Sequence, residues 1–432
     1  MTRYWPLTGA DNFQVLLDRH MRKRSGIGNV VRLALELDPS ADLQTIASGI
    51  SANPNFRLAA GLHMRRATLV MPNWVRGDDK GTSSHVTLLE NCSDVEFIVS
   101  VFQYDIPLKG CPVHVHLVSL ATGRKQVVVS AHHALFDQRG MLNFGRAIQP
   151  GSPSWSEEAL FPERQPQHWW PEFRNTVYIM FYMLGSPFWF MARLLRGKHG
   201  PVAAPVFSVL QFDEAQVGSM EKQAWSLGAR FGQSHFRLAS TLAALQRVFA
   251  ARGEQPPYYW VSMPVSKRRK GSAGHLFGNN LTFVFARLKD DVVRDRTKAI
   301  AAIHAQVKQQ LAADVPARYT SLLNFFRRVP LWLYSTLVNL PMRGDYASLS
   351  FSDLGDEGEG VSSFGGVPVL SAVDYASVPA PPGLTVTFKR NSKGLQLVIG
   401  HVPEALSVAE REQFERDLVA LLTGNGGNTA SI

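Results

Sequence analysis

The chain has 432 residues, of which 45% are hydrophobic and 19% are charged, and its formal net charge at pH 7 is +10. These proportions are typical of a folded globular protein, and the length favours two lobes, because domains usually span ~100–200 residues. The positive charge favours an anionic partner: nucleic acid, anionic lipid, the phosphates of coenzyme A or an acidic carrier protein. The basic residues are dispersed and no nucleic-acid-binding motif occurs, so no nucleic-acid partner is expected.

The cysteines and the N-terminus indicate the compartment. Cys92 and Cys111 are too few for a disulfide framework or a four-cysteine zinc site, which favours a reducing environment. The first six residues, MTRYWP, do not resemble the start of a secretory signal. We therefore expect a cytoplasmic protein.

The first half of the chain mixes strand and helix patterns. Apolar residues alternate over 31–37, which predicts a half-buried strand, and recur at helical spacing over 43–50. Two further runs, 113–120 and 126–131, predict a hairpin across the intervening Thr-Gly-Arg turn. A helix is predicted from Leu142 onward.

The second half repeats this mixture. Residues 213–227 open with a capping-box pattern, and 238–249 are apolar at helical spacing, so both predict helices. Residues 384–388 and 395–399 alternate on either side of an Asn-Ser-Lys-Gly turn, which predicts a second hairpin. A final helix is predicted over 407–424.

Strands and helices are thus mixed in both halves, without the strict strand–helix alternation of a doubly wound sheet. This pattern predicts an α+β protein of two similar lobes. We place the N-terminal lobe at 1–165, a hydrophobic inter-lobe element at 166–200 and the C-terminal lobe at 201–432.

The inter-lobe element contains the stretch VYIMFYMLGSPFWFMARLL at 177–195, in which Arg193 is the only charged residue. A buried helix pair between the lobes, an interfacial element that contacts membrane or a lipidic substrate, and a true membrane span are the three alternatives. A span needs ~20 continuous apolar residues, and Gly185-Ser186-Pro187 would interrupt this one. Trp169 and Trp170 before the stretch suit an interfacial element.

Two adjacent histidines stand out where a buried strand ends, in the sequence VVVSAHHALFDQRG at 127–140. One alternative is a structural role. Another is a metal site, in which His114 and His116 on the preceding strand would join His132 or His133. His132 and His133 point to opposite faces of a continuing strand, and no His-Glu-x-x-His helix is present, so no metal is expected.

A general base is the third alternative. Neutral imidazole has a pKa near ~6.5 and can take a proton from an alcohol or amine at physiological pH. A turn that follows a rigid strand is a suitable place to project such a side chain into a cavity. Asp137 would then orient the ring or hold the loop.

These residues resemble a known family at three places. His132 to Asp137 match the His-His-x-x-x-Asp signature of the acyltransferase superfamily with the chloramphenicol acetyltransferase fold, which includes condensation domains, BAHD acyltransferases and wax ester synthases. The segments at 263–268 (MPVSKR) and 278–280 (GNN) resemble the Pro-Val-x-x-Arg … Gly-Asn segment of the second lobe. The segment at 352–355 (SDLG) is similar to the family's Ser-Asn-Leu-Gly turn.

The resemblance implies a pseudo-dimer of two chloramphenicol acetyltransferase-like lobes with a substrate tunnel between them. It implies His133 as the general base that deprotonates the acceptor. His132, Asp137, Arg268 and Gly140 are implied as support, with Asp137 and Arg268 paired away from the substrate.

The same resemblance places Asn279, Ser352, Asp353 and Gly355 at the substrate tunnel. Two positions depart from the family pattern: Gln138 stands where glycine often follows the aspartate, and Asp353 replaces the asparagine of the turn. No BAHD Asp-Phe-Gly-Trp-Gly motif and no adenylation or carrier domain sequence is present, which favours a free-standing acyltransferase.

The expected function is transfer of an acyl group from a coenzyme A or acyl-carrier-protein thioester to a hydroxyl, or less readily an amine. The thioester is a substrate, so no cofactor is expected. The apolar stretch favours a small-molecule or lipid acceptor or a lipophilic acyl chain, and peripheral membrane contact. The basic run Lys267-Arg268-Arg269-Lys270 is a candidate contact for anionic groups of the donor. A catalytically inactive carrier-protein docking scaffold is the main alternative, and a histidine-based metalloenzyme is a further one.

Overall fold

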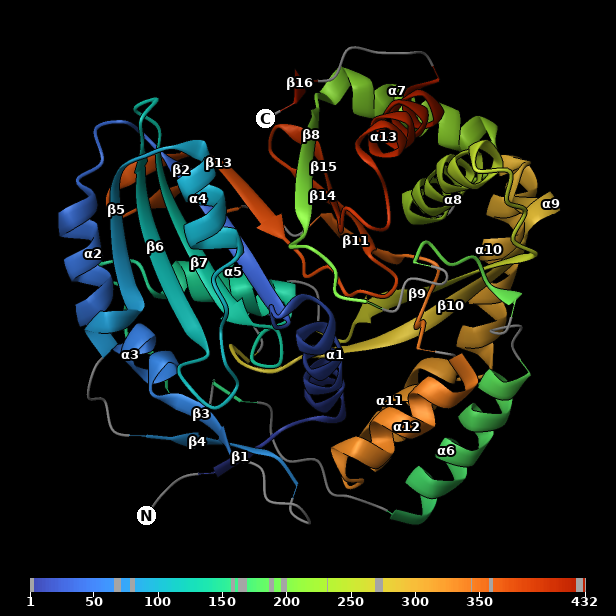
Figure 1. Ribbon diagram of the computed structural model, residues 1–432, viewed down its shortest axis with the longest axis horizontal. Helices are drawn as coiled ribbons and strands as arrows, with labels where there is room; N and C mark the ends of the chain where they lie inside the picture. The colour runs from blue at the N-terminus through green and yellow to red at the C-terminus, as the bar shows by residue number, and fades with distance from the viewer. Residues whose placement is uncertain are drawn as a thin grey trace.

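Helices and strands alternate irregularly along the chain and gather into two lobes, with helix α1 (Gly9–Ser25) between them (Figure 1). This computed structural model describes residues 4–65, 71–77, 82–156, 160–161, 169–185, 190–195, 200–230, 232–268, 275–342, 344–356, 360–424 and 430–431. The α+β class predicted from the mixed patterns is confirmed.

The first lobe is built on a six-stranded sheet with the order β12-β13-β2-β7-β6-β5. Neighbours are antiparallel except β5 and β6, which are parallel. Its strands are β2 (Val30–Leu37), β5 (Val86–Cys92), β6 (Val113–Leu120), β7 (Lys125–His132), β12 (Ser363–Phe364) and β13 (Val367–Tyr375). The predicted hairpin is therefore present as β6 and β7, and Gly123 takes the left-handed conformation at its turn, with φ 83°.

Both faces of this sheet are covered, which the sequence pattern of β2 did not predict. Leu33 and Leu35 pack against α2 (Leu43–Ala52), α3 (Pro54–Ala60) and α5 (Gln138–Ala147). Ala34, on the opposite face, packs in a separate cluster with residues of η2 (Ile98–Phe102), a π-helical turn that continues α4 (Asp94–Phe97). The alternation of β2 therefore separates two cores rather than core from solvent.

Smaller elements complete the first lobe. A three-stranded sheet with the order β1-β4-β3 lies at its lower edge in Figure 1. Its strands are β1 (Tyr4–Pro6), β3 (Leu62–Arg65) and β4 (Asn73–Arg76), and the 3-10 helix η1 (Thr82–His85) precedes β5.

The second lobe has a five-stranded sheet with the order β11-β14-β15-β8-β16. Its strands are β8 (Val206–Phe212), β11 (Ser350–Asp356), β14 (Leu384–Asn391), β15 (Gly394–His401) and β16 (Ala430–Ser431). The predicted hairpin at 384–399 is β14 and β15. Helices α7 (Glu214–Ser226), α8 (Gln233–Ala251) and α13 (Val408–Thr423) pack on the sheet in one core.

Local capping signals fix the starts of α7 and α13. Asp213 and Ser407 each form the capping box that the sequence predicts for α7 and α13, and Gly424 ends α13 in the left-handed conformation. These hydrogen bonds satisfy backbone N–H groups that an isolated helix end leaves without partners.

Between the two main sheets lies the ribbon β9 (Tyr258–Ser266) and β10 (Leu281–Lys289). Its strand β10 packs against α9 (Asp290–Val293), α10 (Arg296–Ala312) and α11 (Val315–Phe326), on the right of Figure 1. Helix α6 (Trp169–Leu184) packs on α11, and α12 (Leu331–Met342) contacts α11 through the stacked rings of Tyr334 and Phe326.

Two segments of the second half of the chain cross into the first lobe. Strand β13 pairs antiparallel with β2, so the first sheet is extended by residues from beyond position 360. The segment 275–280, which connects β9 to β10, reaches the loop after β7, and Gly278 N donates to Leu135 O at 2.7 Å. The proposed boundaries at 165 and 200 remain a prediction. Neither lobe is a continuous piece of chain, because β13 belongs to the first sheet.

The described residues of the apolar stretch at 177–195 are partly buried and partly exposed. Its first part belongs to α6, which packs on α11 and leaves much of its outer face exposed. Residues 186–189, including the predicted break at Ser186-Pro187, lie outside the described residues. Among the helices that the structure describes, none has the length and apolar character needed to cross a membrane.

His114 and His116 lie on β6 and are buried, with ring centroids 4.3 Å apart. Tyr104 packs against both rings, and the Thr87 hydroxyl is 3.0 Å from His114 Nε2. Burial lowers the pKa of His114 to about 4 and that of His116 to about 3. Both rings are therefore neutral parts of the sheet at physiological pH.

This burial predicts a specific acid sensitivity. The unfolded chain takes up protons below about pH 6.5 while the folded rings do not, so stability is full above that pH and is lost as pH falls toward about 4 for His114 and about 3 for His116. At pH 5 the loss is ~2 kcal/mol per histidine. We expect His116→Phe to reduce the drop in melting temperature between pH 7 and pH 5. An unchanged drop would show that these rings do not set the acid sensitivity.

Candidate active site

A cavity of about 280 Å³ lies between the lobes and brings together side chains from both. The first lobe contributes His133 from the end of β7, and the second contributes Ser352 and Asp353 from β11. The ribbon β9 and β10 contributes Ser262 and Phe283. The cavity is partly open to solvent, and the second histidine of the motif, His133, lies in its wall.

The surroundings of His133 fix the state of its ring. The ring Nδ1 lies 2.8 Å from the carbonyl oxygen of Phe136, and only a protonated Nδ1 can donate to that acceptor. The neutral ring then carries its lone pair on Nε2, the nitrogen that a general base uses. The backbone is held as well, because His133 N donates to Asn29 O at 2.8 Å.

Burial also favours the neutral form of this ring. Removal from water lowers the pKa of His133 below its ordinary value, although the Phe136 carbonyl works in the opposite direction. A lowered pKa keeps Nε2 unprotonated over the physiological range. His133 thus has the tautomer and the neutral form that proton abstraction by an imidazole needs.

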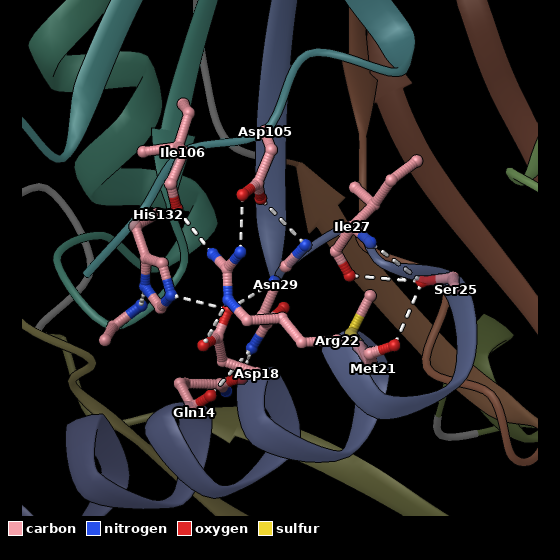
Figure 2. A network of polar contacts seen from close by, with 12 residues as sticks. Gln14, Asp18, Met21, Arg22, Ser25, Ile27, Asn29, Asp105, Ile106 and His132 are labelled. Atoms are coloured by element: carbon pink, nitrogen blue, oxygen red, sulfur yellow. Dashed lines mark hydrogen bonds and ion pairs between the residues drawn. The ribbon is translucent and has the colours of Figure 1, made fainter. Parts of the chain in front are cut away.

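His132 points away from the cavity into a buried polar network beneath α1 (Figure 2). Its Nδ1 accepts from Ala134 N at 3.0 Å, and its Nε2 lies 3.0 Å from Asp18 Oδ1. Burial raises the pKa of Asp18, but the hydrogen bond from His132 and the neighbouring Arg22 outweigh it and leave that pKa lowered. The two adjacent histidines therefore serve different purposes, one facing the cavity and one facing the scaffold.

The network continues from Asp18 to the loop before β6. Arg22 Nε donates to Asp18 at 2.9 Å, and its terminal nitrogens donate to Asp105 and to the carbonyl of Ile106. Asn29 N also donates to Asp18 at 2.9 Å. These contacts fix α1 against the strand that carries both histidines.

Asp137 and Arg268 form a buried ion pair that joins the two halves of the chain. Arg268 Nε is 2.9 Å from Asp137 Oδ2 and its Nη2 is 2.9 Å from Oδ1, a bidentate arrangement. Two further guanidinium N–H groups donate to the carbonyls of His275 and Gly278. This pair holds the loop 275–280 against the turn after His133.

Asp137 is also the N-cap of α5, which begins at Gln138, four residues before the predicted start at Leu142. Its Oδ1 accepts from Gly140 N at 2.7 Å, which is an N-cap contact. A Cβ atom at Gly140 would lie 2.8 Å from the Leu276 carbonyl oxygen. Gly140 is thus required by the close approach of segment 275–280, and Gln138, at the position where the family often has glycine, lines the cavity instead.

Asn279 was predicted to lie at the tunnel, but it is buried and is not among the described residues that line the cavity. Its Nδ2 donates to the His133 carbonyl at 2.8 Å and to Asp11 Oδ1 at 2.9 Å. Asn279 therefore fixes the backbone of His133 from behind. Its neighbour Asn280 lines the cavity.

The turn in β11 explains one departure from the family pattern. Asp353 Oδ1 is 2.8 Å from Arg237 Nη1 on α8, and both side chains are buried. The carboxylate in place of an asparagine thus has a cationic partner. Ser352 and Asp353 line the cavity, whereas Gly355, at φ 61°, does not appear in its described lining.

Among the described residues no group of three or more histidine, cysteine, aspartate or glutamate side chains could hold a metal ion. Among the ring contacts of the described residues, His114 and His116 each pack against Tyr104, and neither packs against His132 or His133. The basic run at 267–270 divides: Lys267 is exposed, Arg268 is buried in its ion pair, and the last two residues lie outside the described part.

Sequence analysis did not single out the residues that support the site from α1 and α8. The pattern Thr8-Gly9-Ala10-Asp11 is a capping-box signal, and it does begin α1 through mutual Thr8 and Asp11 contacts. The part that Asp11 plays in starting α1 was therefore predictable from the sequence. Its second contact with Asn279, and the pairing of Arg237 with Asp353, join positions more than 100 residues apart and have no local signal.

Comparisons with known proteins bear on the fold. No protein-family model matches the sequence, and no curated protein matches it. Among solved structures, a trichothecene 15-O-acetyltransferase from Fusarium sporotrichioides superposes with a TM-score of 0.73 at 12% identity, covering 98% of this chain and 95% of that one. The first condensation domain of the CDA synthetase gives 0.70 at 14% identity, covering 100% and 99%.

A wax ester synthase/diacylglycerol acyltransferase from Marinobacter aquaeolei VT8 gives a TM-score of 0.63 at 14% identity, covering 98% of this chain and 100% of that one. At these identities the likeness concerns the fold, and it extends over essentially the whole chain. The chain therefore has the two-lobed chloramphenicol acetyltransferase-like fold of condensation domains and these acyltransferases.

Proposed function

We propose that this protein is an acyltransferase that moves an acyl group from a coenzyme A or acyl-carrier-protein thioester to a hydroxyl group, with an amine as a less favoured acceptor. The observation that carries the proposal is His133, whose ring donates from Nδ1 to Phe136 O and so leaves Nε2 as the basic atom in an inter-lobe cavity. No cofactor is needed, because the thioester itself supplies the activated acyl group.

The proposed reaction follows from that protonation state. His133 Nε2 takes the proton from the acceptor hydroxyl as its oxygen forms a bond to the thioester carbonyl carbon. The tetrahedral intermediate then collapses, the carbon–sulfur bond breaks, and the thiolate leaves. The proton held by His133 neutralises the leaving thiolate, so the ring returns to its starting state.

The surroundings of the base support this assignment over a metal-dependent or purely structural role. Asn279 and Asn29 hydrogen-bond to the His133 backbone, and the Asp137–Arg268 pair holds the following turn. These contacts position the His133 ring, and none of them is an ion pair between the ring and a carboxylate. Cys92 and Cys111 are free thiols, which supports the proposed cytoplasmic setting.

A thioester panel tests the proposal. The protein is incubated with acetyl, butyryl, octanoyl and dodecanoyl thioesters of coenzyme A and of acyl carrier protein, with and without candidate alcohols and amines, and free thiol is measured. We expect alcohol-dependent thiol release with at least one donor. Binding of acyl carrier protein without any turnover would favour the docking scaffold instead.

We further propose peripheral membrane contact through α6. Its exposed residues include Trp170, at 59% exposure, and Phe181, at 70%. Aromatic side chains of this kind favour the boundary between lipid headgroups and acyl chains, and the net charge of +10 favours an anionic surface. Phe190 is also exposed, while Phe188 and Trp189 lie outside the described residues.

A matched pair of substitutions tests this contact. We expect Trp170→Ser to weaken binding to phosphatidylglycerol vesicles by about tenfold, equivalent to ~1.4 kcal/mol. Trp225→Ser is the control, because Trp225 is 63% exposed on α7, at the opposite end of the second lobe in Figure 1. Equal binding of the two variants in a sedimentation assay would exclude α6 as the contact.

A further inference from the structure

A second cavity of about 360 Å³ adjoins the one that contains His133. The two share four lining residues, Phe13, Ser262, Phe283 and Tyr346, so they meet at one junction. The second cavity, here called the side chamber, extends from that junction beneath α6, α11 and α12. It lies on the side of the site away from the first sheet.

The side chamber is mostly apolar in its described lining, and its hydroxyl groups come from Ser262 and three tyrosines. Aromatic and aliphatic side chains of the ribbon and of the three helices form its walls, and none of the described lining residues is charged. Met180, Leu184 and Leu337 line it and are also 42%, 60% and 43% exposed. The far end therefore reaches the surface among the exposed apolar residues of α6 and α12.

The junction is held in place by polar contacts outside the chamber. The Tyr346 hydroxyl donates to Asn339 Oδ1 at 3.3 Å, and its ring stacks on His20 with centroids 5.4 Å apart. His20 is neutral at physiological pH, because burial lowers its pKa to about 4. The Tyr346 ring is thus fixed at the passage between the two cavities.

We propose that the side chamber binds a single saturated hydrocarbon chain of one reactant, placing the functional group of that chain beside His133. This inference rests on the proposed acyl transfer and adds the substrate class. The mostly apolar, uncharged lining disfavours a sugar, a nucleotide or a charged peptide, because few of their polar groups would find hydrogen-bond partners there. A hydrocarbon chain gains free energy by leaving water for such walls. The chain belongs either to a fatty acyl donor or to a fatty alcohol acceptor.

The chamber volume sets the expected chain length. A methylene group takes up about the space of a water molecule, which is ~30 Å³ in the liquid, so the chamber holds a chain of about twelve carbons. Because the far end reaches the surface, a longer chain can emerge beside α6 and α12. Binding should therefore strengthen up to about twelve carbons and then level off instead of falling sharply.

Photolabelling tests the chamber directly and does not depend on turnover. The probe is dodecanoic acid with a diazirine at its terminal carbon, and the labelled peptides are identified by mass spectrometry. We expect labels on the inner residues of α11 and α12, including Leu322, Leu323 and Val338. Labels confined to the first cavity, at Leu354, Pro379 or Pro382, or to exposed positions of α6, would overturn the proposal.

A matched pair of variants provides the second arm. Val338→Trp fills the chamber, whereas Thr336→Trp places the same side chain on the exposed side of α12 two residues away. We expect Val338→Trp to reduce labelling and dodecanoic acid affinity tenfold or more, and Thr336→Trp to leave both unchanged. Equal behaviour of two folded variants contradicts the proposal, and the labelling of the unmodified protein decides the question if Val338→Trp does not fold.

Two reaction series distinguish the source of the chain. In one, the donor is acetyl or dodecanoyl coenzyme A with a short alcohol, and in the other the acceptor is ethanol or 1-dodecanol with acetyl coenzyme A. The series in which Val338→Trp raises KM for the long chain alone identifies the reactant that occupies the chamber. If the side chamber is labelled but neither series shows turnover, the proposal that the chamber binds a hydrocarbon chain stands, whereas the proposed acyl transfer fails.

Discussion

Replacing His133 with alanine is expected to lower kcat by ~10²–10⁴-fold, because the acceptor hydroxyl then loses the base that removes its proton. The fold and the affinity for the donor thioester should persist. Within the described part of the chain the His133 side chain makes one hydrogen bond, from its Nδ1 to Phe136 O. Its backbone contacts with Asn29 and Asn279 survive the substitution. Steady-state kinetics with the best thioester and alcohol pair provide the measurement.

The neighbouring histidine is the control for this experiment. His132→Ala should lower stability by ~1–3 kcal/mol, because the buried Asp18 carboxylate loses a hydrogen-bond donor, but it should reduce kcat less than His133→Ala does. The pH profile gives a second readout: since burial lowers the pKa of His133, the activity of the unmodified protein should persist below pH 6.5. Near-equal activity of His133→Ala and the unmodified protein would exclude His133 as the base.

Removing the carboxylate of Asp137 is expected to reduce the free energy of unfolding by ~3–5 kcal/mol. The Arg268 side chain is 1% exposed, so Asp137→Ala leaves a buried guanidinium without its anion. It also removes the N-cap of α5 and the acceptor of the Asn280 N–H. Chemical denaturation measures the loss, and activity should fall with the displaced turn after His133.

A double substitution separates the ion pair from other effects. Asp137→Asn combined with Arg268→Met removes both charges, so it should cost less than either single change, because no buried charge remains unpaired. Asp137→Asn alone keeps a capping side chain and should still be destabilised. A fully stable but inactive Asp137→Asn variant would instead assign Asp137 a direct part in the chemistry.

Much of the fold was predictable because its signals are local. Two apolar runs and a Thr-Gly-Arg turn predict the hairpin at 113–131, and Gly123 takes the left-handed conformation that the turn requires. Helices α7 and α13 begin at the predicted caps because Asp213 and Ser407 satisfy backbone N–H groups within three residues. The pairing of Asp137 with Arg268 has no such local signal, because the two residues are 131 positions apart, and it was expected only from the family resemblance.

The features that escaped prediction depend on contacts between distant parts of the chain. Alternation along β2 could not reveal that η2 covers its second face. The addition of β13 to the first sheet and the reach of segment 275–280 require strands and loops to be placed in space. Asn279 was assigned to the tunnel by resemblance, yet its amide is used by Asp11 and the His133 carbonyl.

The central claim is that the cavity transfers an acyl group directly from thioester to hydroxyl with His133 as the base. A single-turnover reaction with an ¹⁸O-labelled alcohol, followed by mass spectrometry of the protein and products, tests it most directly. The account predicts one ester per thiol released, ¹⁸O retained in that ester, no acylated protein, and a strong decrease in rate for His133→Ala. Thiol release with formation of free acid only, or the same rate without His133, would contradict it.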